Sequence, residues 1–249
     1  MNPQVVSSER WLAARQQLRD REIELFQARD AVSEARRALP AVLVKKDYVF
    51  EGPGGEARLV DLFEGRRQLI IYHFMFDPAW DQGCKHCSFL ADNIGHPAHL
   101  HSRDTTIALV SRAPREKIVP FQLRMGWILP WYSSYGSSFN YDFHVTLDEA
   151  VAPVEYDFRG KAILERDGER YYTRGEQGGV SVFLRDGEDV LHTYSAYGDK
   201  LEFLQGTYNY LDLTPLGRQD APGRPWLRHH DKYKATLAGD RAASGPPAK

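Results

Sequence analysis

Residues 69–93 read LIIYHFMFDPAWDQGCKHCSFLADN and contain both the most apolar segment of the chain and its two cysteines. Leu69 to Phe76 is an apolar run rich in β-forming residues, which predicts a buried strand. A loop follows over residues 77–83, and residues 87–93 continue as a helix. A strand, a loop and a helix that begins at a Cys-x-x-Cys pair indicate an α/β protein with a redox site.

The two cysteines of the chain, Cys84 and Cys87, stand three positions apart. At a helix start this spacing puts both sulfurs on one side, where unpaired backbone N–H groups and the helix dipole favour an anion. The thiolate of Cys84 is therefore stabilised, which makes Cys84 the nucleophile and Cys87 the resolving thiol. Lys85 and His86 add positive charge that lowers the pKa of Cys84 further. A stabilised thiolate favours the reduced form, so we expect a couple more oxidising than thioredoxin.

Two other interpretations of the pair stay open. Cys84 and Cys87 with two nearby histidines, His99 and His101, would complete a tetrahedral zinc site, so a metal-binding or metal-delivery protein is the alternative function. In the other interpretation, both cysteines are buried and chemically inert. In a reducing cytosol paired thiols are more often redox or metal groups than structural bridges, so we favour a redox-active Cys84–Cys87 disulfide with no metal or other bound cofactor.

Strands and helices alternate along the rest of the chain, which favours an α/β fold with a mixed sheet flanked by helices. The further elements expected are a hairpin over 48–59, a helical turn over 60–65, a strand over 105–110, a helix over 114–125, a hairpin over 180–194 and a helix over 201–211. One domain then covers residues 41–216, with an aromatic-rich, irregular insertion at about 126–178. We expect the tail, residues 217–249, either to wrap around the domain as an extended segment or to be disordered, especially after Gly239.

Residues 9–38 predict one long helix that Ser7 or Ser8 caps and Pro40 ends. A narrow apolar stripe recurs every seven residues, at Trp11, Leu18, Leu25, Val32 and Leu39. The segment 1–40 is therefore either an amphipathic helix packed on the domain or an arm that pairs with a second copy in a homodimer.

Composition excludes several classes of protein. The chain of 249 residues has 32 basic and 34 acidic side chains, a net charge of −2, which argues against a nucleic-acid-binding surface. The apolar run over 69–76 is too short to span a membrane, and the N-terminus lacks the plan of a signal peptide. We therefore expect a cytoplasmic protein whose partners are a disulfide or peroxide substrate and a reductant that the sequence does not specify.

Four motifs resemble those of a known family: MFDPAWDQGCKHCSFLADN at 75–93, WILPWYSSYGSSFNYDF at 127–143, HTYSAYG at 192–198 and LDLTPLGR at 211–218. They are similar to signatures of a bacterial family of unknown function, number eight-nine-nine among such domains. That family is catalogued as predicted dithiol-disulfide oxidoreductases of the thioredoxin superfamily. The resemblance implies a thioredoxin-like sheet with Cys84 and Cys87 at a helix start.

Two departures from thioredoxins bear on the substrate. Thioredoxins carry a proline before the strand that faces the cysteines, whereas residues 177–180 here are Gln-Gly-Gly-Val, and Gly83 replaces the tryptophan before the first cysteine. Both changes favour a substrate other than an extended polypeptide. Aromatic residues over 121–143 either fill a satellite core or form a wall of the pocket. The pocket candidates are Trp80, Trp131, Tyr135 and Tyr141.

Overall fold

The computed structural model describes residues 4–221 and 223–233. In chain order its elements are α1 (Ser8–Arg37), β1 (Val42–Leu43), β2 (Val49–Gly52), β3 (Gly55–Arg58), η1 (Asp61–Phe63), β4 (Gln68–His73), α2 (Lys85–Asp92), α3 (Ala98–His101), β5 (Thr105–Ser111), α4 (Arg115–Arg124), β6 (Trp131–Ser133), α5 (Phe139–Asp142), β7 (Thr146–Leu147), β8 (Glu155–Tyr156), β9 (Arg159–Gly160), α6 (Lys161–Arg166), η2 (Arg170–Thr173), β10 (Gly175–Glu176), β11 (Gly179–Asp186), β12 (Asp189–Tyr197), η3 (Gly198–Leu204), α7 (Gly206–Leu211) and η4 (His230–Lys232).

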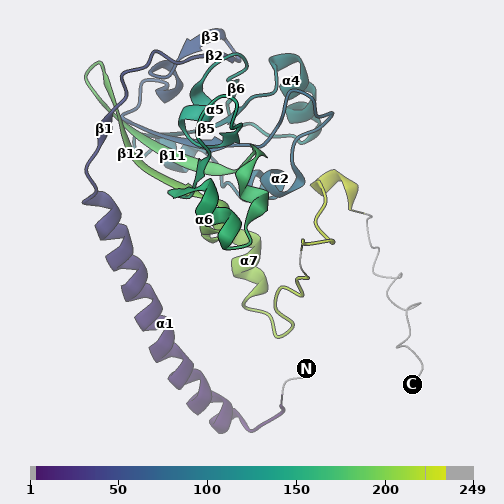
Figure 1. Cartoon of the computed structure of the whole chain (residues 1–249). Coiled ribbons are helices and arrows are strands. Elements are labelled where there is room, and N and C mark those ends of the chain that lie inside the picture. Colours follow the sequence, from purple (N-terminus) through teal and green to yellow (C-terminus); the bar gives the residue numbers. More distant parts are fainter. Residues whose placement is uncertain (1–3, 222, 234–249) are drawn as a thin grey trace, which may run out of the picture.

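The central sheet has eight strands in the order β1-β12-β11-β4-β5-β6-β2-β3 (Figure 1). Strands β4 and β5 pair in parallel, and α2 lies between them in the chain. The hairpin β11–β12 adds antiparallel on the other side of β4. A β-α-β unit followed by a hairpin and a closing helix is the connectivity expected of a thioredoxin-like fold. The expected fold class is confirmed.

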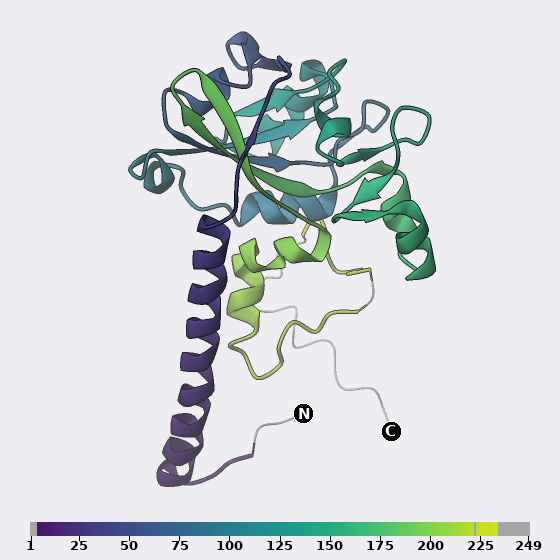
Figure 2. The ribbon, with the colours of Figure 1, turned by 60° about the vertical axis from the view of Figure 1, so that its left-hand side comes forward.

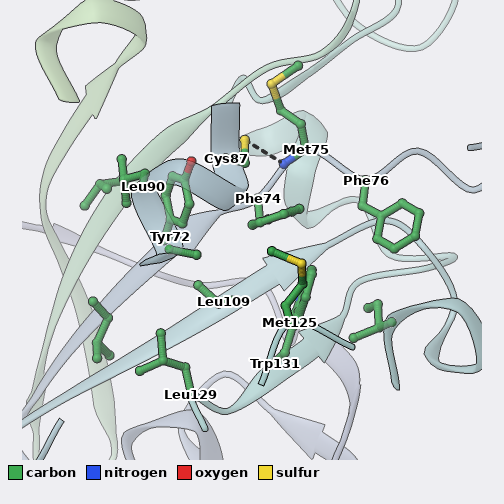
Figure 3. Packing of buried hydrophobic residues seen from close by; sticks show 14 of the residues in the cluster. Tyr72, Phe74, Met75, Phe76, Cys87, Leu90, Leu109, Met125, Leu129 and Trp131 are labelled. Atoms are coloured by element: carbon green, nitrogen blue, oxygen red, sulfur yellow. Dashed lines mark hydrogen bonds between the residues drawn. The ribbon is translucent and has the colours of Figure 1, made fainter. Parts of the chain in front are cut away.

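Strand β4 separates two apolar layers because its side chains alternate between the faces of the sheet. Tyr72 and the neighbouring Phe74 pack with α2 and α4 in one core cluster (Figure 3). Ile71 packs on the opposite face, with Phe139 of α5 and Phe63 of η1. The first layer holds the base of α2, so the cysteines lie beside a rigid core at the carboxyl end of β4.

Helix α1 matches its predicted bounds, and the side chain of Ser7 caps it by accepting a hydrogen bond from the amide of Arg10 at 3.4 Å. The helix extends away from the sheet in both views (Figures 1 and 2). It buries no residue, and Trp11 and Leu25 are 60% and 68% exposed. The structure therefore does not show the first of the two expected placements, in which the helix packs along the domain.

Pairing of α1 with a second copy stays a prediction. The heptad stripe is exposed along the helix, and burial of such a seam between two copies stabilises a coiled coil. We expect a dimer by light scattering, and a monomer when Leu18→Glu places a charge in the seam. A wild-type monomer at high protein concentration would contradict the expectation.

Several boundaries differ from the prediction. Strand β4 ends at His73 rather than at residue 76, and α2 begins at Lys85 rather than at Cys87. The helix expected over 201–211 is broken into η3 and α7. Within the supposedly irregular insertion, β6 joins the central sheet in parallel with β5. A strand of three residues shows no periodicity, so the pattern of the sequence could not reveal it.

The described part of the tail wraps back onto the domain. Leu227 is 1% exposed and packs with Phe89 of α2 and Tyr208 of α7. The disorder expected after Gly239 lies outside the described residues. No helix in the described ranges combines the length and apolar character needed to cross a membrane.

Candidate active site

The backbone holds Cys84 at the very start of α2. Its amide donates to the carbonyl of Met75 at 3.0 Å, which ties the helix start to the end of β4. Its carbonyl accepts the amide and the hydroxyl of Ser88, each at 2.9 Å. Cys84 is thus the N-cap residue, half-buried, and its side chain faces the unpaired amides of the first helical turn.

Gly83 is required by the packing just before the pair. A Cβ atom at this position would stand 2.5 Å from a ring carbon of Phe74 and 2.8 Å from one of Phe121. Both rings belong to the buried core under α2 and α4. A tryptophan cannot fit there, which explains why this chain departs from the thioredoxin pattern at this position.

The two thiols differ in pKa. Cys84 has its pKa lowered to about 7, chiefly by a hydrogen bond from the Cys87 thiol and also by the amides of Cys87 and His86 and the charge of Lys85. Burial raises the pKa of Cys87, and the neighbouring Cys84 adds to the rise. Near neutral pH the pair therefore holds a thiolate on Cys84 and a thiol on Cys87, which is the arrangement expected from the sequence for a nucleophile and a resolving residue.

Two polar groups act on the sulfur of Cys87, which is only 3% exposed. The amide of Met75 donates to it at 3.4 Å (Figure 3), and the hydroxyl of Tyr72 lowers the pKa of the Cys87 thiol. Both groups favour a thiolate on Cys87 when Cys84 no longer carries the charge. Tyr72 was not among the residues predicted. The signal in the sequence that could have identified it is that Tyr72 carries the one hydroxyl of the run over 69–76.

His86 acts differently from the prediction. Its backbone amide helps to lower the pKa of Cys84, but burial, Lys85 and Arg224 lower the pKa of its own ring. A neutral imidazole brings no charge to the thiolate. The structure thus corrects the expected role of the His86 side chain and keeps that of Lys85.

The rate of alkylation of Cys84 should follow the thiolate fraction. Below the pKa of about 7 we expect the rate to fall about tenfold per pH unit, and above it to level off. Because the backbone amide is retained, His86→Ala should leave this midpoint unchanged, whereas Lys85→Ala should raise it. The measurement is thiolate absorbance or alkylation rate against pH. A large rise in His86→Ala would restore the role of the ring.

The cysteines open into a cavity of about 530 Å³. Its lining residues are Tyr72, Met75, Cys84, His86, Cys87, Leu90, Tyr156, Tyr171, Tyr172, Gln177, Gly178, Gly198, Asp199, Leu201, Gln205, Gly223 and Arg224. The volume falls in the range of small-molecule sites. The aromatic residues over 121–143 do not form a wall of this cavity, and the insertion lines it instead with Tyr156, Tyr171 and Tyr172.

None of the four aromatic residues proposed from the sequence lines this cavity. Trp131 is fully buried in the core and donates to the hydroxyl of Ser111. Trp80 is exposed in the loop between β4 and α2, and Tyr135 lines a different cavity, near Lys46. Tyr141 packs under the guanidinium of Arg112. The prediction was wrong at all four positions because pattern alone does not tell a core aromatic from one in a pocket.

The alternative zinc site is not assembled. His99 and His101 lie on α3, and the chain then leads to Asp104. The backbone carbonyl of Asp104 accepts a hydrogen bond from the amide of Gln68, the first residue of β4. The cysteines lie beyond the opposite end of that strand. In the part of the chain that the structure describes, no group of three or more His, Cys, Asp or Glu residues could hold a metal.

The segment opposite the cysteines is fixed by a buried ion pair. Glu176 is 4% exposed and accepts from Arg112 at 2.9 Å and from Thr146 at 3.0 Å. Burial raises the pKa of this carboxyl to about 7. The pair anchors β10, and the residues that follow it, Gln177 and Gly178, reach the cavity. A Cβ at Gly178 would stand 3.9 Å from the sulfur of Cys87.

Comparison with known proteins gives a family and a set of distant structural likenesses. A profile of the family described as "Bacterial protein of unknown function (DUF899)" matches residues 1–233. No curated protein matches the sequence.

Among solved structures, the chain is similar to the bacterioferritin comigratory protein of Xanthomonas campestris, at 11% identity over 68% of this chain and 96% of that one, with a TM-score of 0.43. It is also similar to a Xanthomonas campestris peroxiredoxin Q variant, at 12% identity over 69% and 98%, TM-score 0.44. BsSco, a member of the Sco family of cytochrome c oxidase assembly proteins, is 14% identical over 68% and 96%, TM-score 0.37. At such low scores these likenesses carry no argument about activity.

Proposed function

The chain belongs to this bacterial family of unknown function, and from the geometry of its cysteine pair we propose that it is a dithiol–disulfide oxidoreductase. The observation that supports the proposal most is the placement of the two sulfurs: Cys84 is half-buried at the N-cap of α2 and lines the cavity, and Cys87 is buried beside it. A pair of inert buried cysteines has no need of this asymmetry.

In the first step the Cys84 thiolate attacks one sulfur of a substrate disulfide. A bond forms between Cys84 and that sulfur, the substrate S–S bond breaks, and one half leaves as a thiolate. The half-buried position of Cys84 at the cavity gives the substrate access to this sulfur, while Cys87 stays covered.

In the second step Cys87 resolves the mixed disulfide. Its proton passes to the departing thiolate or to solvent, its sulfur attacks Cys84, and the second half of the substrate leaves. Met75 and Tyr72 stabilise the thiolate that forms on Cys87. The dithiol is oxidised to a disulfide and the substrate is reduced to two thiols, so an external thiol reductant, one dithiol or two monothiols, must restore the enzyme.

A hydroperoxide is the other oxidant expected from the sequence. The Cys84 thiolate would take one oxygen and release an alcohol, and Cys87 would displace hydroxide from the resulting sulfenic acid, which leaves with a proton as water. The same disulfide results, so the two substrates differ only in the first intermediate, which a sulfenic-acid reagent detects.

The proposal is tested by oxidising the reduced protein mildly with diamide and then alkylating it under denaturing conditions. We expect both thiols to disappear together and the intact mass to fall by two hydrogen atoms, with dithiothreitol reversing the change. Persistence of both thiols under these conditions would contradict the proposed function. Cys87→Ser, which cannot bridge within one chain, is the control.

Tyr72→Phe should slow the second step more than the first. It removes the hydroxyl that lowers the pKa of Cys87 and keeps the ring that packs in the core. Loss of one polar group that stabilises a charged atom costs about 1.5–3 kcal/mol, or roughly ten- to a hundredfold in rate. Rapid acid quench followed by mass analysis would show the mixed disulfide on Cys84 building up. An unchanged resolving rate would remove Tyr72 from the mechanism.

A further inference from the structure

Two backbone groups that face the cysteines are already hydrogen-bonded within the protein. The amide of Gln177 donates to the carbonyl of Val145 at 2.8 Å, and the hydroxyl of Tyr156 donates to the carbonyl of Gly178 at 2.7 Å. An extended polypeptide is recognised by main-chain hydrogen bonds to a free strand. Here the Gln177 amide and the Gly178 carbonyl are already hydrogen-bonded to residues of the insertion, whereas a bound polypeptide would need them for its own hydrogen bonds.

The same insertion overhangs the cavity with aromatic rings. Tyr156 is 2% exposed and stacks on Tyr172 with ring centroids 5.0 Å apart, and Tyr171 stands beside Tyr172. The backbone carbonyl of Tyr171 accepts from the side-chain amide of Gln177 at 3.0 Å. This wall is therefore anchored to the segment that faces the cysteines.

A second segment covers the helix start from the other side. Residues 223–233, which we call the strap, contribute Gly223 and Arg224 to the cavity lining. The ring nitrogen Nε2 of His229 lies 2.9 Å from the carbonyl oxygen of Gly83, the residue before Cys84. Leu227 is buried against α2, and Asp231 pairs with Arg124 at 3.1 Å.

We infer that the substrate is a low-molecular-weight disulfide that enters this cavity, and that disulfides within polypeptides are excluded. The inference rests on the proposed function. The cysteines lie at the floor of a space of about 530 Å³ between the tyrosines and the strap, which suits a small molecule. Four tyrosines line the cavity, and its charged side chains, Arg224 and Asp199, have opposite signs, with Arg224 already paired with Glu202 at 2.9 Å, so a neutral disulfide is a suitable probe.

The test mixes the reduced, full-length protein with an excess of bis(2-hydroxyethyl) disulfide or of insulin and follows formation of the Cys84–Cys87 bridge by alkylation and mass. A polypeptide can react only with molecules in which the strap is open. If about 1% of the molecules are open, insulin should react about a hundredfold more slowly than the small disulfide. Leu227→Ser loosens the strap and should shift the ratio of the two rates toward insulin by about tenfold. The matched control is Leu213→Ser, at a position that is 82% exposed.

Each outcome separates this inference from the proposed function. Oxidation by insulin at a rate close to that of the small disulfide would overturn the inference and leave the oxidoreductase in place. Failure of the small disulfide to react, in protein that diamide does bridge, would overturn the substrate class alone. If diamide forms no bridge either, both fail. The wild-type comparison needs no variant, so poor folding of Leu227→Ser leaves the test decisive.

Discussion

Cys84→Ser is expected to abolish the reaction with disulfides, with a rate lower by about a thousandfold or more. A serine hydroxyl is not ionised near pH 7, and its oxygen cannot form the mixed disulfide. Cys87 cannot take over, because it is 3% exposed and burial holds its pKa well above the ordinary value. The measurement is the loss of free thiol with bis(2-hydroxyethyl) disulfide.

Stability provides the control for this variant. Serine is a favourable N-cap residue, so Cys84→Ser should keep α2 intact and change the melting temperature little. A folded Cys84→Ser protein that still reacts at nearly the wild-type rate would identify Cys87 as the nucleophile and reverse the assigned roles.

Cys87→Ser is expected to stop the reaction halfway. The first step remains because Cys84 is present and the serine hydroxyl can still donate a hydrogen bond to its thiolate in place of the Cys87 thiol. Resolution within one molecule is favoured by proximity, so its loss should lengthen the life of the mixed disulfide by about a thousandfold or more. Intact mass should then increase by one substrate half on Cys84.

The wild-type protein is the comparison for that adduct. It should pass through the mixed disulfide without accumulating it, because Cys87 lies next to Cys84 with two stabilising groups in place. Equal amounts of adduct on both proteins, or its absence from Cys87→Ser after substrate is consumed, would show that Cys87 does not resolve the intermediate.

The sequence allowed much of the fold to be predicted. The apolar run at β4, the regular stripe of α1 and the hairpin β11–β12 are local patterns, and each lies within a few residues of its expected bounds. The placement of Cys84 at a helix start also followed from local pattern, and the roles proposed for the two cysteines rest on it. The precise ends of elements, the break in the helix expected over 201–211 and the short elements within 126–178, β6 among them, depended on packing that the pattern does not contain.

The walls of the cavity could not be predicted in the same way. Tyr156 and Tyr172 come from the insertion and Arg224 from the strap, so their meeting above Cys84 depends on long-range contacts. Trp131 and Tyr135 have the same aromatic character but lie in the core and on another surface. The His86 ring was expected to be charged, and burial against Lys85 and Arg224 is a tertiary effect that spacing cannot reveal.

The reduction potential of the Cys84–Cys87 couple tests the central claim most directly. A lowered pKa at Cys84 stabilises the reduced form, so the potential should lie in the range of redox-active dithiols, between about −270 and −120 mV. Titration in glutathione redox buffers, with dithiothreitol buffers for the lower potentials, read by alkylation and mass, should show both cysteines changing together in one two-electron transition. Two thiols that remain free at every potential up to about −120 mV, or that titrate separately, would contradict the account.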